Sequence, residues 1–281
     1  MSADMIVLPD GSVPIPAPQH KGFETLCPEL HKLRAYLPHE VHGETKRFLS
    51  ACIAEANSTN LKDCSPASVC RAVFNCARIG LIPGATLGHA FFIPYGPQCT
   101  LVVGYKGYTD LAYGCGFLRS VHCEVVLDGE TFERWNDENG EHYRHVLPPG
   151  RQEKWDNILA AYCRWESTTG GRGSELVERP DLQTLYDKGC RGKLQVWKNN
   201  PVPMSKKTAM LRAARQTWKL TGRMQHAVYL DTLGEIGKSQ PLLSAPDGAE
   251  PLQLGLSKPG LDQYDNPPTE ADPTEYDKPD F

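Results

Sequence analysis

Ten lysines and arginines, and no aspartate or glutamate, lie between residues 188 and 223 of a chain whose formal net charge is −4. Within this cationic segment, the stretch MSKKTAMLRAARQTWKLTGR (204–223) predicts a helix that starts near Ser205. Leu211, Ala214 and Trp218 follow the helical repeat and would form its apolar face. The neighbouring positions are cationic. The chemistry that such a segment offers is binding of a polyanion, most commonly a phosphate backbone.

The basic face of this helix consists of five side chains, none of which has a glutamate four residues before it. Its first turn would hold two lysines, where the helix dipole disfavours cations by a few tenths to about 1 kcal/mol. An anion from outside would explain both features. The alternative is a solvated face whose cations pair with acids elsewhere in the fold. The five residues are Lys206, Lys207, Arg212, Arg215 and Lys219.

Aromatic residues and glycine-rich loops beside further cations favour a single strand of nucleic acid as the ligand. A ring next to a phosphate-binding cation can stack a base, which contributes about 1–3 kcal/mol per base. Each ring taken singly could equally belong to the core. An arginine at the tip of TTGGRGS (168–174), an expected hairpin, could clamp a backbone or lie in a solvent loop. The residues added to the predicted DNA-contacting set are Tyr105, Lys106, Arg172, Lys193, Trp197 and Lys198.

Two alternative functions stay open. Asp128, Glu130 and Glu133 could form the metal cluster of a DNA-processing nuclease, although a turn between two strands explains Asp-Gly without chemistry. A sheet-based RNA-binding module is the other alternative. The chain has no G-x-x-x-x-G-K-[ST] motif, which argues against ATP-driven strand exchange. It has no C-x-x-C pair for a zinc site. No motif requires a cofactor, Mg²⁺ included.

Helical repeats come first along the chain, strand-like alternation follows, and a helical pattern returns at the cationic segment. Ser65 and Pro66 suit the N-cap and first position of a helix. Gly96-Pro97-Gln98 suits a three-residue hairpin loop. This order predicts an α+β fold with a mostly antiparallel sheet. The expected helices are 28–37, 43–57, 65–81, 105–116, 180–188 and the cationic one. The expected strands are 89–95, 99–105, 118–128, 158–167 and ELVER (175–179), the partner of 158–167 in the second hairpin.

Charge and proline content divide the chain into three parts. Residues 1–27 form a proline-rich arm, residues 28–234 a folded body, and residues 235–281 a tail. The tail holds ten acids, three lysines and eight prolines, so its net charge is −7 and it is expected to be disordered. The first 234 residues therefore carry −4 − (−7) = +3. No segment resembles a signal peptide or a membrane span. We expect a cytoplasmic protein with reduced, mostly buried cysteines.

The stretch ARIGLIPGATLGHAFFIPYGPQCTLVVGYKGYTDLAYGCG (77–116) resembles the core signature of the RecT family of phage and prophage single-strand annealing proteins. That signature runs from a helix through Gly-Leu-x-Pro and Ile-Pro-Tyr to Gly-Tyr-Lys-Gly and Asp-Leu-Ala. Its order is kept here over most of the chain, from about residue 43 to 223. The matching motifs are GLIP (80–83), IPY (93–95), GYKG (104–107), DLA (110–112), VVLDGETFE (125–133), AAYCRW (160–165) and MSKKTAMLRAA (204–214).

The resemblance implies ATP-independent binding of single-stranded DNA and annealing of complementary strands. It also implies rings or helical filaments, a partner 5′→3′ exonuclease, and a curved sheet backed by helices, similar to eukaryotic annealing mediators. No bond is made or broken in annealing, so an enzyme is not expected. Members often carry acids between the tryptophan and Lys-Lys-Thr, whereas WKNNPVPMSKKT (197–208) has none. The acidic end DPTEYDKPDF (272–281) loosely resembles the ends of bacterial single-strand-binding proteins, and a host protein of that kind is a further candidate partner.

Overall fold

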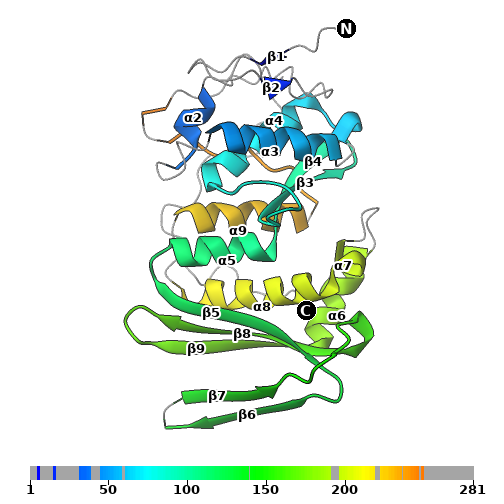
Figure 1. Ribbon diagram of the computed structural model, residues 1–281, viewed down its shortest axis with the longest axis vertical. Coiled ribbons are helices and arrows are strands. Elements are labelled where there is room, and N and C mark those ends of the chain that lie inside the picture. The colour runs from blue at the N-terminus through cyan, green and yellow to red at the C-terminus, as the bar shows by residue number, and fades with distance from the viewer. Residues whose placement is uncertain are drawn as a thin grey trace.

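A computed structural model of the protein describes residues 5–6, 15–16, 32–38, 45–58, 61–138, 140–190, 196–218, 222–235, 237–246 and 248–249. Helices and antiparallel sheets alternate in layers (Figure 1). The expected α+β fold, with an antiparallel sheet backed by helices, is confirmed. Most of the predicted arm lies outside the described residues, apart from a short pairing of β1 (Met5–Ile6) with β2 (Ile15–Pro16).

The helices are α2 (Leu33–Tyr36), α3 (Thr45–Ser58), α4 (Pro66–Ile79), α5 (Tyr105–Gly114), α6 (Arg179–Cys190), α7 (Val196–Asn199), α8 (Pro201–Thr217) and α9 (Gly222–Glu235). The longer strands are β3 (Ala90–Tyr95), β4 (Gln98–Val103), β5 (Leu118–Leu127), β6 (Thr131–Asp137), β7 (Gly140–Val146), β8 (Ile158–Ser167) and β9 (Arg172–Glu178). Short 3₁₀ turns lie at Leu61–Asp63 and Trp155–Asn157.

Helix α4 forms where its capping residues predict it. The Ser65 hydroxyl accepts a hydrogen bond from the Ser68 amide at 3.4 Å, and Pro66 occupies the first helical position. The helix ends at Ile79 and is capped by Gly80, whose φ of 81° is left-handed, so it stops two residues before the expected end at 81. The apolar stripe of α4 is buried in the main core. The β3–β4 hairpin beside it closes through Gly96 and Pro97 alone, one residue fewer than expected.

The central sheet has the order β5-β8-β9, with antiparallel pairing throughout. Helix α8 packs across one face of it, and the β6–β7 hairpin lies on the opposite side (Figure 1). The face towards α8 is apolar and buried, as at Val125, Ala161 and Val177. Eight cysteines of the described residues are free thiols, and all of these eight except Cys115 are buried, in line with the expectation of mostly buried thiols.

The β6–β7 hairpin is an element that the sequence pattern did not predict, because neither strand shows a clear apolar alternation and β6 is largely exposed. Phe132 and Tyr143 stack on Tyr162 of β8, with ring centroids 5.7 Å away in each case. Phe132 also packs on a small second core formed by Val126, Ala160 and Tyr162. The hairpin is therefore anchored to one end of the sheet by aromatic contacts.

The prediction that a disordered tail begins at residue 235 is wrong for its first residues. The Gln240 side chain is buried, accepts a hydrogen bond from the Leu101 amide and donates to the carbonyls of Leu101 and Leu230, each at 2.8 Å. The Leu243 amide donates to Asn75 Oδ1 at 2.9 Å. Residues 237–246 thus form a strap along β4 and α4, whereas residues 250–281 lie outside the described residues.

Candidate nucleic-acid interface

The cationic helix α8 begins at Pro201, four residues before the expected start at Ser205. Proline at the first position suits a helix start because its missing amide would have no helical partner. Ser205 is buried, and its hydroxyl donates to the Pro201 carbonyl at 2.8 Å. Lys206 and Lys207 therefore lie in the second turn. The argument that the helix dipole disfavours them does not hold.

Lys207 is a structural residue, which corrects its assignment to the DNA-contacting set. Its side chain is 4% exposed, and its ammonium forms an ion pair with Asp231 of α9. The same ammonium lies 5.3 Å from the centroid of the Tyr108 ring on α5. Tyr108 donates its hydroxyl proton to Asp231 Oδ2 at 2.8 Å, and the Val103 amide donates to Oδ1 at 3.3 Å. The pair joins α5, α8 and α9, and leaves no charge at the surface.

Lys206 belongs to a second ionic network, at the junction of α8, the sheet and the hairpin. Its Nζ lies 2.7 Å from Glu124 Oε1, which is also 3.3 Å from Arg151 Nη1. Arg151 Nε in turn lies 2.9 Å from the carboxylate of Glu130, which contacts His145 at 3.0 Å. Burial acts to raise the pKa of Glu124, but the hydrogen bonds from Lys206 and the Val125 amide, with the charges of Lys206 and Arg151, outweigh it and lower the pKa.

The remaining cations of α8 are more accessible. Arg212 is half-buried and forms an ion pair with Asp181 of α6 at 2.7 Å. Arg215 is exposed, and it donates a hydrogen bond to Thr232 at 3.2 Å. These two arginines lie one turn apart on the helix surface. Lys193 and Lys219 lie outside the described residues. For three of the five predicted cations, the alternative of pairing within the fold is therefore the observed arrangement.

Trp197 is buried, which corrects its assignment as a base-stacking platform. It packs edge-on against Trp155 and Tyr186, which stack on each other with centroids 3.9 Å apart. The guanidinium of Arg179 lies 4.0 Å above the Trp155 ring. Trp197 thus completes an aromatic core between α6 and α7. Its neighbour Lys198 is exposed.

The Gly-Tyr-Lys-Gly motif opens α5, where a helix was expected from residue 105, and its glycines allow a close contact between two backbones. A Cβ on Gly104 would lie 2.3 Å from the Gly88 carbonyl oxygen, and one on Gly107 would lie 2.1 Å from that of His89. Tyr105 is half-buried against the main core, and burial raises the pKa of its hydroxyl. Lys106 is exposed at the start of the helix. The tight turn therefore presents Lys106, whereas Tyr105 serves mainly as packing.

Arg172 opens β9 beside the 168–171 loop, close to its predicted place at a hairpin tip. Its side chain is 79% exposed, and its Nε lies 3.7 Å from Glu166. Such a loose, solvated ion pair contributes little stability. The arginine remains able to reach a ligand.

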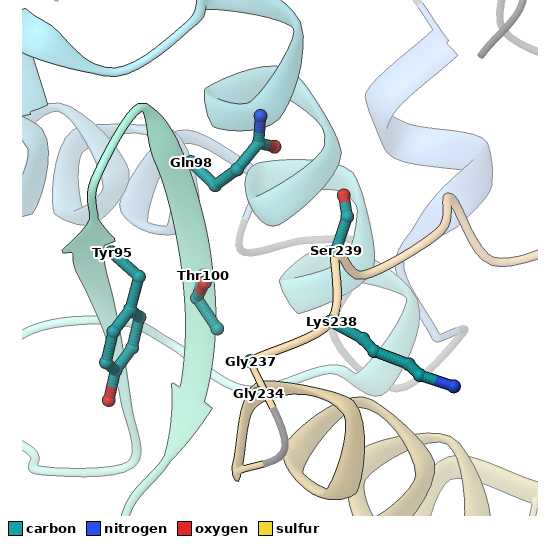
Figure 2. Close-up of a pocket in the computed structure, with 7 residues that line it drawn as sticks. All are labelled: Tyr95, Gln98, Thr100, Gly234, Gly237, Lys238 and Ser239. Atoms are coloured by element: carbon teal, nitrogen blue, oxygen red, sulfur yellow. The ribbon is translucent and has the colours of Figure 1, made fainter.

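A small pocket lies between the β3–β4 hairpin and the strap, away from the α8 ion pairs. Figure 2 shows Tyr95 and Thr100 on the hairpin side and Gly234, Gly237 and Ser239 facing them, with the Lys238 side chain pointing away from the hairpin. The pocket encloses about 50 Å³, which is room for a few water molecules. It is too small for a nucleotide.

The acids that suggested a nuclease are dispersed. Glu130 is held by Arg151 and His145, Glu133 pairs with Arg144 at 3.6 Å, and Asp128 is exposed in a turn. Across the described ranges, no group of three or more histidines, cysteines and acids is placed to hold a metal ion. Within the same ranges, no helix is long and apolar enough to cross a membrane.

Comparison with known proteins agrees with the motif order. The profile of the RecT family matches residues 46–231. The chain belongs to the RecT family. It is 27% identical to protein RecT of Escherichia coli (strain K12) over 209 residues, which cover 71% of this chain and 75% of that protein. It is also 25% identical to the uncharacterized protein YqaK of Bacillus subtilis (strain 168) over 242 residues, or 82% of each chain.

Membership of the RecT family places the protein among recombination proteins that bind and anneal DNA strands. Of the buried Lys207 cluster, Lys207 lies in the motif at 204–214, Tyr108 lies between the motifs at 104–107 and 110–112, and their partner Asp231 lies outside all of the motifs. Sequence reasoning missed Asp231, Glu124 and Arg151. The signal that existed was indirect: cations without nearby acids in the sequence need partners from distant elements if they are buried.

Proposed function

We propose that the protein anneals complementary DNA strands without ATP, as an oligomer, and that it is not an enzyme. The observation that carries the proposal is the RecT match over residues 46–231, which spans every layer from α3 to α9. The absence of a phosphate-binding G-x-x-x-x-G-K-[ST] loop from the sequence supports the independence from ATP. No motif in the sequence requires Mg²⁺, although the ion is a possible cofactor, and we expect a location in the cytoplasm of a bacterial host.

We propose that DNA phosphates contact the predicted cations that stay accessible. Lys106, Lys198 and Arg215 are exposed, and each has no carboxylate within ion-pair distance among the described residues. Arg212 can join them by exchanging Asp181 for a phosphate, because its ion pair is partly solvated. Contacts with phosphates carry no sequence information, so this binding should ignore base sequence. The Watson–Crick edges then stay free to pair.

Oligomer formation follows from the same physical argument. The first few base pairs between two strands are weak, so one subunit cannot hold enough of a strand to test complementarity. A row of subunits would present a long extended strand at once. We further propose that a 5′→3′ exonuclease supplies the single strand and that a host single-strand-binding protein is a second partner. An annealed duplex is the expected product.

The deciding experiment uses two complementary, end-labelled oligonucleotides and the full chain in EDTA, with no nucleotide added. Conversion to full-length duplex at a rate well above the spontaneous one is the expected result. A parallel reaction with Mg²⁺ tests for a nuclease, which would yield shortened strands. A spontaneous rate in both buffers, or shortened products, would contradict the proposal. Light scattering with and without DNA measures the oligomer separately.

A further inference from the structure

The outer face of the central sheet, defined as the face opposite α8, changes in character along its length. Residues that pair directly across antiparallel strands point to the same side. Near Val126, this face is apolar and lies under the hairpin. Beyond the row that contains Tyr162, two successive rows hold polar or charged residues. These rows are His122–Arg164–Ser174 and Ser120–Glu166–Arg172.

The β6–β7 hairpin covers the first end of the outer face and leaves these two rows open. The hairpin contacts Tyr162, in the row before Arg164, through Phe132 and Tyr143. In contrast, His122, Arg164 and Arg172 are all exposed. The surface is solvent-accessible, although it lies beside an aromatic core.

Positive charge exceeds negative charge on the open rows. The Arg164 guanidinium lies 5.6 Å over the Tyr162 ring, and no carboxylate of the described residues is within ion-pair distance of it. Arg119 and Arg172 share a single acid, Glu166, at 3.2 and 3.7 Å. Arg134, on the side of the hairpin that faces the sheet, lies 5.9 Å over the Tyr143 ring. Among the described residues, Arg119, Arg164 and Arg172 therefore bring three cations to or beside the open rows, whose one acid is Glu166.

We propose that these open rows bind the sugar-phosphate backbone of a nucleic-acid strand, with Arg164 and Arg172 as the phosphate contacts. Guanidinium groups suit this ligand because they bind phosphate oxygens in a planar, bidentate manner. Arg164 and Arg172 lie in adjacent rows on neighbouring strands, a diagonal relation that separates the two positions by about 7–8 Å. The two arginines therefore match phosphates that are close neighbours on one strand.

This inference rests on the proposed function and deepens it. Annealing brings two polyanionic strands together, so both need neutralising charge. Two of the predicted α8 cations, Lys206 and Lys207, are held inside the fold. The outer face supplies further positive charge, of which the predicted DNA-contacting set included only Arg172. A protein partner would favour a more apolar centre, whereas the polar rows hold serines and arginines with no large aliphatic side chain.

The test compares salt dependence of binding among folded variants of the full chain. Fluorescence anisotropy with labelled oligo(dT) should show that Arg164→Ala with Arg172→Ala lowers the log–log salt slope by about 1.4, or 0.7 per lost phosphate contact on a single strand. Arg164→Lys with Arg172→Lys should retain the wild-type slope. The matched control, Arg144→Ala with Lys46→Ala, removes equal charge from the far face of the hairpin and from α3, where both residues are exposed.

Thermal melting of each variant confirms that it folds. A wild-type slope in the alanine pair, or a loss equal to that of the control, would overturn the inference. Binding of oligo(dT) and annealing by the wild-type protein test the proposed function independently. If the wild-type protein neither binds oligo(dT) nor anneals strands, the proposed function is wrong. If the wild-type protein does both but the Arg164 and Arg172 variants keep the wild-type salt slope, only the role of these two arginines is wrong.

Discussion

Lys207 and Asp231 form a buried ion pair whose two side chains are each 4% exposed. Asp231 also accepts hydrogen bonds from Tyr108 and from the Val103 amide, so its two oxygens are both in use. The lysine comes from a motif that on sequence grounds offered a phosphate contact. Lys207 instead neutralises Asp231 at the point where α5, α8 and α9 meet. We therefore expect this ion pair to determine the stability of the fold and not its affinity for DNA.

Replacing Lys207 by alanine should therefore destabilise the protein by about 3–5 kcal/mol, because the Asp231 charge would be left buried and unpaired. Chemical unfolding followed by circular dichroism measures this. Arg215→Ala is the control, since an exposed substitution is expected within about 0.5 kcal/mol of wild type. A Lys207→Ala protein with wild-type stability and weakened DNA binding would restore the original assignment.

Lys106→Ala combined with Arg215→Ala should weaken binding equally for every DNA sequence and lower the log–log salt slope by about 1.4 for a single strand. Both side chains are exposed, so stability should hardly change. Salt titrations on oligonucleotides of different sequence provide the measurement. Lys46→Ala with Lys154→Ala serves as the control for net charge, because both residues are exposed as well. Equal slopes in the two double variants would remove Lys106 and Arg215 from the interface.

Acid should weaken the fold through Glu124. Its folded-state pKa is lowered, so the carboxylate stabilises the protein above the unfolded-state pKa, and that contribution is lost as pH falls through the folded value. Wild-type stability should thus decline more steeply than that of Glu124→Gln as the pH falls below about 4.5, the pKa of an unperturbed glutamate. Glu178→Gln, which alters an exposed acid, should follow the wild-type curve. Parallel curves for wild type and Glu124→Gln would show that the Lys206 contact does not stabilise the fold.

His122 should couple DNA binding to pH. Burial lowers the pKa of His122, and the charges of Arg164, Lys206 and His145 lower it further, against an opposing effect of Glu124. A phosphate bound beside Arg164 would raise this pKa, so binding takes up a proton and affinity should increase as pH falls from 8 to 6. His122→Gln should lose part of that increase. His142→Gln, on the opposite face of the hairpin, should keep it, and identical pH profiles for the two variants would contradict the coupling.

Local signals in the sequence were enough to place most elements and the family. Ser65 and Pro66 start α4, and the alternating apolar residues of the β3–β4 hairpin and of β8 gave their strands. The partners of buried cations could not be inferred, because Asp231 and Glu124 approach α8 only after several elements have packed. The β6–β7 hairpin was missed because β6 is largely exposed and neither strand shows a clear apolar alternation.

The acidic end of the chain should compete with DNA for the cations of the protein. Because the strap (residues 237–246) packs on the fold, a deletion that tests this competition must begin after the strap. Residues 250–281 hold eight acids and two lysines, a net charge of −6. Deleting them should tighten oligo(dT) binding at low salt, with the gain shrinking as the Debye length shortens to about 8 Å at physiological ionic strength. A deletion from residue 240 would also remove Gln240 and Leu243, which are buried, and should destabilise the fold. Unchanged low-salt affinity after the shorter deletion would show that this end does not compete, and would favour a role in binding the exonuclease.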